Sequence, residues 1–188
     1  MEIIETYIQN LKIIKPTPIY DNRGYFMESF KINFMERHFP DIRFVQENES
    51  KSSYGVLRGL HFQKPPFAQT KLVRVIEGEV LDVAVDLREG SLSYGKYKSV
   101  ILSDKNHLQL FIPKGFAHGF LVLSKTAIFQ YKVDNPYNQE SEEGIRYDDK
   151  ELNIDWILPD SDLIISKKDY KNKSFEEYRK SEEKFLFI

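Results

Sequence analysis

Two of the four histidines have the surroundings that best fit acid–base or metal chemistry. His61 lies in the stretch Arg58–Gln63 (RGLHFQ), and His118 lies in the stretch Pro113–Phe120 (PKGFAHGF). A neutral imidazole titrates near physiological pH, so each ring can serve as a base, an acid or a metal ligand. The other two histidines fall at a predicted helix end and in a polar turn, and we expect both on the solvated surface: His38 and His107.

The spacing Pro-x-Gly-x-x-His that ends at His118 resembles the second motif of the cupin superfamily, small jelly-roll barrels whose interior commonly holds a metal. Metal-binding members also supply His-x-His and a glutamate from their first motif, whereas Phe62 and Gln63 follow His61 here. A stable divalent site needs three or more nitrogen or oxygen ligands at suitable spacing. We therefore expect no metal and no other cofactor.

Short strands are expected to position these side chains. The middle of the chain alternates β-branched or aromatic runs with turn residues, which is typical of a sandwich or closed barrel. Alternation within Val80–Asp86 places its apolar residues on one face, so Asp82 and Asp86 point into a polar barrel interior or out to solvent. The predicted strands are Leu72–Ile76, Val80–Asp86, Lys98–Leu102, Gln109–Ile112, Phe120–Leu123 and Ala127–Val133.

Helices are predicted only near the two ends of the chain. The segment Ile32–Phe39 is a candidate helix that must end before Pro40, because the residue before a proline avoids helical backbone angles. Ser174, with Glu177 three residues later, makes a capping box that starts a second helix running through about Glu183.

Composition favours one globular domain. The 188 residues are 41% hydrophobic, 30% charged and 14% aromatic, which suits a β-rich core and argues against disorder. The 27 basic and 29 acidic residues leave a net charge of -2, so no global field attracts nucleic acid. The chain has no cysteine, no run of about 18 apolar residues and no signal-peptide pattern, so we expect no disulfide, no membrane anchor and a cytoplasmic location. We predict one all-β domain over residues 1–188, with a helical or irregular tail from about residue 170.

An ordered series of short sequence blocks narrows the resemblance from the cupin superfamily to a single family. The blocks run in this order: Asp21–Phe26 (DNRGYF), Gln46–Asn48 (QEN), Arg58–His61 (RGLH), Lys71–Val73 (KLV), Gly115–Phe120 (GFAHGF), Tyr131-Lys132, Tyr137 and Ser166–Asp169 (SKKD). From about Leu11 to Asp169 the chain resembles the dTDP-4-dehydrorhamnose 3,5-epimerase family. The resemblance implies a cupin-like jelly-roll barrel, a homodimer, and a step in dTDP-L-rhamnose synthesis for polysaccharides such as O-antigen.

The reaction of that family explains why these residue types belong together. A ketone at C4 acidifies the hydrogens at C3 and C5, so inversion needs a base on one face, an acid on the other, and stabilisation of the enolate. By the resemblance, His61 is the base, and Asp169 fixes its tautomer and orientation. Lys71 places a positive charge at the enolate oxygen, and Tyr131 returns a proton from the opposite face. Taken singly, each residue has a structural or surface alternative; the family order favours the catalytic roles.

The resemblance also implies a set of substrate-binding residues. Arg23, Arg58 and Lys168 suit the diphosphate, because guanidinium and ammonium groups bind phosphate oxygens. Tyr137 is expected to stack on thymine, and Phe26 to line the base pocket, with a place in the core as the alternative for Phe26. The remaining members are expected near the nucleotide or the sugar: Glu28, Gln46, Asn48, His118 and Glu142.

Three other functions stay open. An epimerase that acts at C3 or C5 alone, or on a related nucleotide sugar, would use the same base and acid. A metal-dependent cupin isomerase or oxygenase would need the missing His-x-His ligands. A sugar-binding module without activity would need none of the four catalytic residues. We also expect the apolar end, Phe185–Ile188, to pack on the barrel or on the partner subunit.

Overall fold

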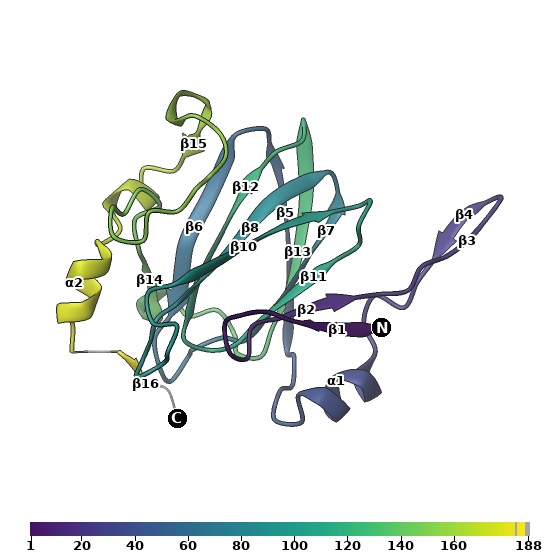
Figure 1. Ribbon diagram of the computed structural model, residues 1–188, viewed down its shortest axis with the longest axis horizontal. Helices are drawn as coiled ribbons and strands as arrows, with labels where there is room; N and C mark the ends of the chain where they lie inside the picture. The colour runs from purple at the N-terminus through teal and green to yellow at the C-terminus, as the bar shows by residue number, and fades with distance from the viewer. Residues whose placement is uncertain (183, 187–188) are drawn as a thin grey trace.

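Two antiparallel sheets packed face to face dominate the computed structural model, which describes residues 1–182 and 184–186 (Figure 1). The first sheet has the strand order β1 (Glu2–Glu5), β2 (Lys12–Lys15), β11 (Gln109–Ile112), β7 (Lys71–Glu77), β13 (Thr126–Val133) and β5 (Gln46–Ser53). The second has the order β10 (Tyr97–Ser103), β8 (Glu79–Asp86), β12 (Phe116–Val122), β6 (Val56–Gln63) and β14 (Glu142–Gly144). The predicted all-β, cupin-like jelly-roll barrel is therefore confirmed.

Smaller elements decorate this barrel. The strand β15 (Ile164–Ile165) pairs in parallel with β6. Two further two-stranded sheets join β3 (Ile19–Asp21) to β4 (Gly24–Phe26) and β9 (Arg88–Glu89) to β16 (Phe185–Leu186). The helices are short: α1 (Ile32–His38), α2 (Phe175–Lys180), and the 3-10 turns η1 (Gln139–Ser141), η2 (Asp160–Asp162) and η3 (Asp169–Lys171). None of the helices in the described part of the chain is long and apolar enough to cross a membrane.

The six predicted strands are confirmed as strands, with one clear shift in bounds. The strand β12 begins at Phe116, four residues before the predicted start, and so includes His118. The strands in the first third of the chain were not predicted. The most informative of these is β5 (QENESKSS), whose residues have low β-propensity but alternate between half-buried and exposed. Pairing with β13 along its whole length holds β5 in the sheet.

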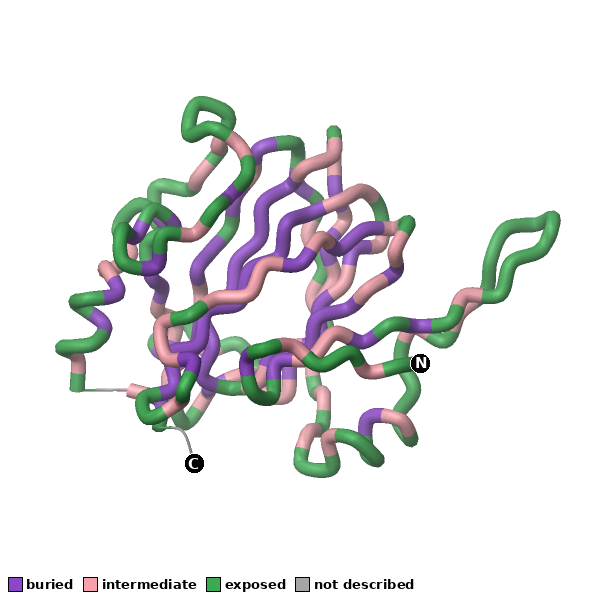
Figure 2. The backbone as a smooth tube through the Cα atoms, in the orientation of Figure 1, coloured by how far each residue is buried: buried purple, intermediate pink, exposed green. Residues whose placement is uncertain are grey.

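The main core lies between the two sheets, where buried backbone runs along the facing strands (Figure 2). Val73 and Phe129 from the first sheet pack with Val80 and Phe120 from the second. Because side chains alternate along β8, its other apolar residues face outward, toward the C-terminal segment. Both faces of β8 are therefore covered, and Asp82 and Asp86 are buried in the interior rather than exposed to solvent.

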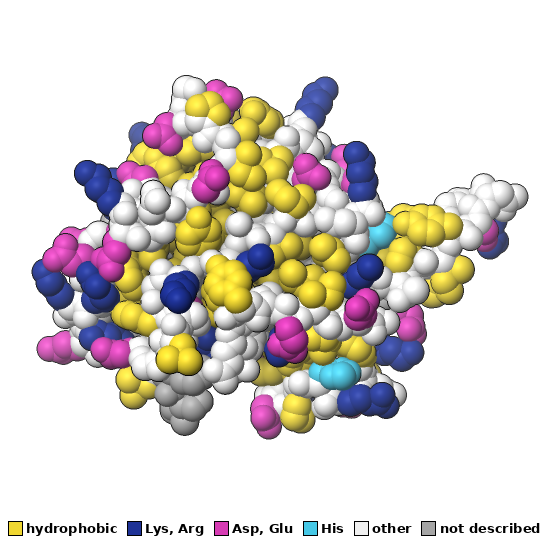
Figure 3. Space-filling view, in the orientation of Figure 1, with side chains coloured by type: hydrophobic (Ala, Val, Ile, Leu, Met, Phe, Trp, Pro, Cys, Tyr) yellow, Lys and Arg dark blue, Asp and Glu magenta, His cyan; other side chains and the backbone are white. Residues whose placement is uncertain are grey.

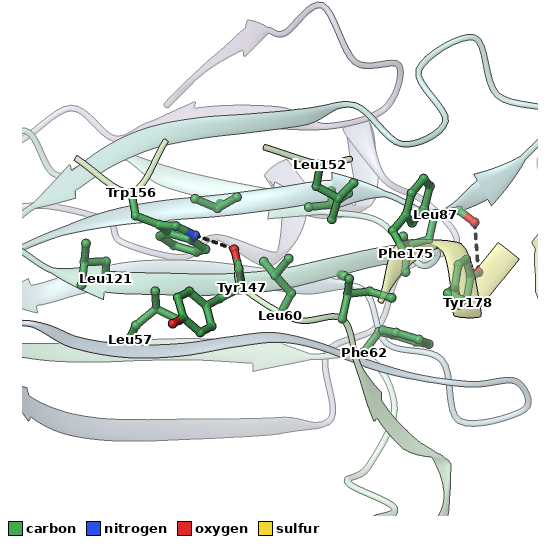
Figure 4. Close-up of a cluster of buried hydrophobic side chains, with 14 of the residues drawn as sticks. Leu57, Leu60, Phe62, Leu87, Leu121, Tyr147, Leu152, Trp156, Phe175 and Tyr178 are labelled. Atoms are coloured by element: carbon green, nitrogen blue, oxygen red, sulfur yellow. Dashed lines mark hydrogen bonds between the residues drawn. The ribbon is translucent and has the colours of Figure 1, made fainter. Parts of the chain in front are cut away.

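A second core covers the outer face of the second sheet (Figure 4). Trp156 packs there and donates a 2.9 Å hydrogen bond from Nε1 to the carbonyl oxygen of Tyr147. Tyr178 of α2 donates a 3.1 Å bond to the carbonyl oxygen of Leu87. These contacts fasten the C-terminal segment, which carries Asp169, onto the barrel.

The two predicted helices are present. The helix α1 has nearly its predicted bounds, and it covers the outer face of the first sheet, where Met35 packs with Leu72. The capping box at Ser174 is also confirmed, but α2 ends at Lys180, earlier than predicted. Glu183, given as the approximate end, lies outside the described residues.

The end of the tail packs partly on the barrel. Phe185 is buried, and its ring lies 5.8 Å from that of Phe62. Leu186 is exposed, and Phe187 and Ile188 lie outside the described residues. The predicted packing of this end on the barrel is therefore confirmed for Phe185.

The strands β3 and β4 form an arm that projects from the barrel and carries exposed apolar side chains (Figures 1 and 3). Ile19 and Phe26 are 68% and 70% exposed. One prediction is wrong at the base of the arm: His107 is buried rather than solvated, and the ring of Tyr25 packs 4.7 Å from its imidazole. His38 is exposed, as predicted.

Candidate active site

A cavity of about 580 Å³ opens in the barrel, lined by β5, β6, β7, β12 and β13 and by the segment around β15. Apolar residues such as Phe120 and Phe129 also line it. The cavity brings together eight of the predicted site residues: Asn48, Arg58, His61, Lys71, His118, Tyr131, Lys168 and Asp169. Most of these lie far apart in sequence, and strand pairing is what gathers them.

His61 is held by a carboxylate from the C-terminal segment. Its Nε2 lies 2.8 Å from Oδ1 of Asp169, which is 3% exposed. Burial raises the pKa of Asp169, but hydrogen bonds from His61, the Gly59 backbone and Ser166 outweigh it, so the pKa is lowered. An ionised carboxylate can only accept, so Nε2 carries the proton and Nδ1 keeps a free lone pair. The contact with Asp169 fixes the orientation of the His61 ring.

A second histidine–carboxylate pair lies beside the first. His118 is opposite His61 in the register of β6 and β12, and its Nε2 lies 2.9 Å from Oδ2 of Asp82. Burial lowers the pKa of His118, and Asp82 partly opposes this. The sequence did not identify Asp82 as a site residue. The alternation of β8 put it on the correct face, but its partner lies 36 residues away.

The two histidines share one cavity because β6 and β12 approach closely. Gly59 has φ of +135°, and a Cβ there would lie 2.5 Å from Cα of Gly119. The register shifts at this point, between His118 and Phe120. Any side chain at Gly59 would force the strands apart, so these glycines set the spacing of the site.

Lys71 supplies the positive charge of the interior. It begins β7 and lines the cavity. Burial lowers its pKa to about 8, while the charges of Asp82 and Glu142 act to raise it. An ammonium group with this pKa is mostly charged at neutral pH. It can therefore stabilise an anion that forms nearby.

A row of polar side chains lies along one face of β5, which pairs with the strand that carries Tyr131. The inward positions of the strand are Gln46, Asn48, Ser50 and Ser52, which alternate with exposed residues. Asn48 is directly opposite Tyr131 in the β13–β5 register. Burial raises the pKa of Tyr131, and a side-chain hydrogen bond from Asn48 partly offsets that rise. Neither serine was predicted as a site residue, although the i, i+2 pattern from Gln46 could have identified them.

Two groups form the polar rim of the cavity. Arg58 donates from Nε and Nη2 to Oγ of Ser52, both at 3.2 Å. Beside it, Glu142 accepts hydrogen bonds from the Tyr137 hydroxyl at 2.7 Å and from the Lys168 ammonium at 2.5 Å. The rim therefore holds two cationic groups at the cavity mouth, which suits a phosphate-bearing ligand.

Six predicted binding residues do not line this cavity. Three of them are hydrogen-bonded directly or through one another to residues that do: Gln46 to Asn48, and Tyr137 to Glu142, which binds Lys168.

The other three lie on or beside the arm. Arg23 and Phe26 lie on the exposed arm, and Glu28 follows it, paired with Lys31 at 2.9 Å. Arg23 pairs with Asp21 at 2.6 Å and is otherwise exposed. The arm points away from the barrel (Figure 1), so none of the three lines the cavity of its own chain.

Within residues 1–182 and 184–186, no three His, Cys, Asp or Glu side chains are grouped so that they could hold a metal. The Nε2 atoms of His61 and His118 each bond a carboxylate instead.

The fold and the cavity define a cupin-like barrel that carries acid–base residues in its interior. A family model described as dTDP-4-dehydrorhamnose 3,5-epimerase matches residues 5–177. The chain belongs to the dTDP-4-dehydrorhamnose 3,5-epimerase family and is an isomerase.

Individual relatives are similar to this protein in sequence and in structure over nearly the whole chain. The dTDP-4-dehydrorhamnose 3,5-epimerase of Escherichia coli (strain K12) is 52% identical over 90% of this chain and 91% of its own length. The crystal structure of the enzyme of that name from Elizabethkingia anophelis has a TM-score of 0.90 at 50% identity, over 94% of this chain and 97% of its own. The dTDP-6-deoxy-D-glucose-3,5-epimerase of Legionella pneumophila, solved with dTDP-4-keto-L-rhamnose, has a TM-score of 0.89 at 49% identity, over 93% of each chain.

Proposed function

We propose that this protein is a dTDP-4-dehydrorhamnose 3,5-epimerase. It converts dTDP-4-keto-6-deoxy-D-glucose to dTDP-4-keto-L-rhamnose by inverting C3 and C5, as a step of dTDP-L-rhamnose synthesis. The observation that carries the proposal is the cavity in which His61, Lys71, Tyr131 and Asp169 meet. Each of the four supplies one function that the reaction requires.

His61 starts each inversion. Its Nδ1 removes the proton from a carbon beside the C4 ketone, and the electron pair moves onto O4 to form an enolate. The Asp169 carboxylate, 2.8 Å from Nε2, holds the ring in the required tautomer and stabilises the imidazolium. The charged Lys71 stabilises the enolate oxygen. His118, held by Asp82, faces the sugar beside His61.

Tyr131 completes the inversion. It donates its phenolic proton to the opposite face of the enolate, so one proton leaves the carbon and one returns. The alkaline pKa of a phenol does not prevent this step, because an enolate is a strong enough base to take the proton. The sugar keeps its oxidation state, so the reaction consumes no oxidant or reductant.

The rim binds the nucleotide. Arg58 and Lys168 both line the cavity and bind the diphosphate, because guanidinium and ammonium groups bind phosphate oxygens. Tyr137 stacks on thymine, and its hydroxyl is fixed by Glu142. Gln46 and Asn48 line the path between the rim and the sugar.

The functional unit is a homodimer in which the arm of one copy reaches the site of the other. Arg23, Phe26 and Glu28 then join the nucleotide end of the second cavity. The exposed apolar side chains of the arm support this proposal, because large exposed apolar groups are usually buried against a partner.

The test is NMR of dTDP-4-keto-6-deoxy-D-glucose with metal-stripped protein in deuterated water. The proposal predicts deuterium at both C3 and C5, and an L-sugar product that a reductase can trap. Deuterium at one carbon alone would indicate a single-site epimerase instead. Activity that disappears with the metal and returns when it is restored would indicate a metal-dependent cupin. A protein that binds the sugar nucleotide without any exchange would be a binding module.

A further inference from the structure

The side-chain amide of Gln63 holds the loop that carries Tyr137. Gln63 is the last residue of β6, and it is 4% exposed. Its Oε1 accepts a hydrogen bond from the backbone N–H of Asn138 at 2.7 Å. Its Nε2 donates to the carbonyl oxygens of Pro136 at 3.2 Å and of Phe67 at 2.7 Å. The amide therefore bonds the residues on both sides of Tyr137 and joins their loop to the loop that follows β6.

The polarity of these three partners fixes the amide in one orientation. A backbone N–H can only donate and a carbonyl oxygen can only accept, so Gln63 cannot exchange its oxygen and nitrogen without losing all three bonds. Both N–H groups of the amide are used, and its oxygen has a partner. Such an amide holds its surroundings in place, because movement of the loop would leave a buried polar group unpaired.

The hydroxyl end of Tyr137 is tied to the same residue through the second sheet. The hydroxyl donates to Oε2 of Glu142 at 2.7 Å, and Glu142 is directly opposite Gln63 in the pairing of β14 with β6. The backbone N–H of Tyr137 donates to Oε1 of Gln46 at 3.2 Å. Although both ends are held, Tyr137 is 55% exposed. A ring that is exposed and already fixed can receive a planar group without first being ordered.

Other amides join the same two loops, but further from Tyr137. Nδ2 of Asn135 donates to the carbonyl oxygen of Ala68 at 2.9 Å, and Nε2 of Gln69 donates to the carbonyl oxygen of Asn135 at 2.8 Å. These contacts hold the start of the loop, whereas Gln63 bonds the two residues next to Tyr137.

From this geometry we propose that Gln63 is a positioning residue for nucleotide binding. It sets the Tyr137 ring in place for the base, so the loop does not have to be ordered when the nucleotide arrives. Gln63 is not among the residues that line the cavity, and the role requires no contact with the substrate. The proposal rests on the stacking of Tyr137 on the base in the proposed function, and it places a determinant of base affinity outside the site itself.

The variant Gln63→Met tests this role, because it keeps the length of the side chain, removes all three hydrogen bonds and adds no charge. We expect the Kd for dTDP, measured by calorimetry, to rise about three- to tenfold, the range that one net hydrogen bond supports. KM should rise with it while kcat stays unchanged. The Kd for inorganic pyrophosphate, which has no base, should also stay unchanged. An unchanged Kd for dTDP, or an equal rise for both ligands, would overturn the proposal.

The matched control is Gln139→Met, the same substitution at an exposed position two residues after Tyr137. It should change neither Kd. If Gln63→Met does not fold, Gln63→Asn replaces it, because the shorter side chain places its amide one carbon further from the loop.

A double-mutant cycle with Tyr137→Ala separates positioning from general support of the fold. Tyr137→Ala should weaken dTDP binding, and Gln63→Met should add no further loss in that background. An equal loss in both backgrounds would overturn the proposal. If Tyr137→Ala bound dTDP as well as the wild type does, the stacking itself would be contradicted, and the role of Gln63 with it. A wild type that binds dTDP but shows no epimerisation would contradict the proposed reaction, and the binding cycle would still test Gln63.

A readout without any ligand is hydrogen exchange of the Tyr137 backbone N–H, followed by NMR. Its acceptor Gln46 is intact in Gln63→Met, so exchange becomes faster only if the loop opens more often. We expect faster exchange in Gln63→Met than in the wild type and in Gln139→Met. An unchanged rate would contradict the positioning role of Gln63.

Discussion

The interior cavity and the exposed arm both carry predicted site residues, but these residues differ in their burial and in their hydrogen-bond partners. In the cavity, both histidines have a fixed partner: Asp169, 3% exposed, holds His61, and Asp82, fully buried, holds His118. On the arm, Phe26 is 70% exposed and Arg23 bonds only its near neighbour Asp21 among the described residues. The histidine–carboxylate pairs are therefore organised within one chain, whereas these two side chains of the arm stay exposed in it. In the proposed dimer, the partner subunit supplies their surroundings.

The largest effect that we expect is in the cavity. His61→Ala removes the base, so epimerisation should fall by about 10³-fold, within the range for loss of a general base. Deuterium exchange at both carbons should fall with it, while dTDP still binds. His38→Ala is the control, because that histidine is exposed and far from the cavity. Exchange that persists in His61→Ala would assign the base elsewhere.

Tyr131→Phe should separate the two halves of the reaction. Without the phenol, inversion at one centre should fall by about 10²-fold, because the returning proton must come from water. Proton abstraction by His61 should continue, so deuterium still enters the sugar. Solvent-exchange NMR beside product analysis measures both. Epimerisation at the wild-type rate would refute the assignment of Tyr131 as the acid.

Because Lys71 must be charged to stabilise the enolate, we expect the activity to fall at alkaline pH. Burial lowers its pKa to about 8, so the ammonium is present below that pH and is lost as the pH rises through it. Because the cation stabilises the enolate, kcat/KM of the free enzyme should decline above about pH 8. Lys71→Arg keeps its charge to much higher pH. Its profile should lose that decline, and an unchanged alkaline limb would show that another group causes it.

The smallest effect concerns the rim. Ser52→Ala removes the acceptor that Arg58 uses at 3.2 Å, so the guanidinium loses its fixed orientation. KM for the sugar nucleotide should rise about two- to fivefold with kcat unchanged, since one neutral hydrogen bond contributes little. Ser53→Ala is the matched control on the exposed face of β5. Equal KM values in the two variants would remove Ser52 from the account.

Features that depend on local sequence patterns could be predicted, whereas features that depend on contacts between distant residues could not. Alternation along Val80–Asp86 identified a face, and the capping box at Ser174 identified a helix start, because both are local patterns. His107 is buried and packs against Tyr25, more than 80 residues away, and no local pattern could show that contact. The strand β5 was missed because its polar inner row suits a cavity rather than a core.

The site itself divides in the same way. The ordered blocks identified the residues, but only strand pairing brings His61 beside His118 and Asn48 beside Tyr131. The pairing of Asp82 with His118 had no signal beyond the face on which Asp82 lies. The position of Arg23 and Phe26, away from their own cavity, was not evident from the blocks.

The central claim is that one chain supplies the acid–base residues and that the arm of a second chain completes the site. Complementation between two variants tests this claim most directly. Two variants are co-expressed with different affinity tags, and the mixed dimer is purified: His61→Ala, and the double variant Arg23→Ala, Phe26→Ala. If the arm acts across the dimer, one of the two sites combines an intact His61 with an intact arm. The mixed dimer should then show about half of the wild-type activity, although each parent homodimer is strongly impaired. A mixed dimer no more active than the arm variant would contradict the account, because the arm would then serve its own chain or none.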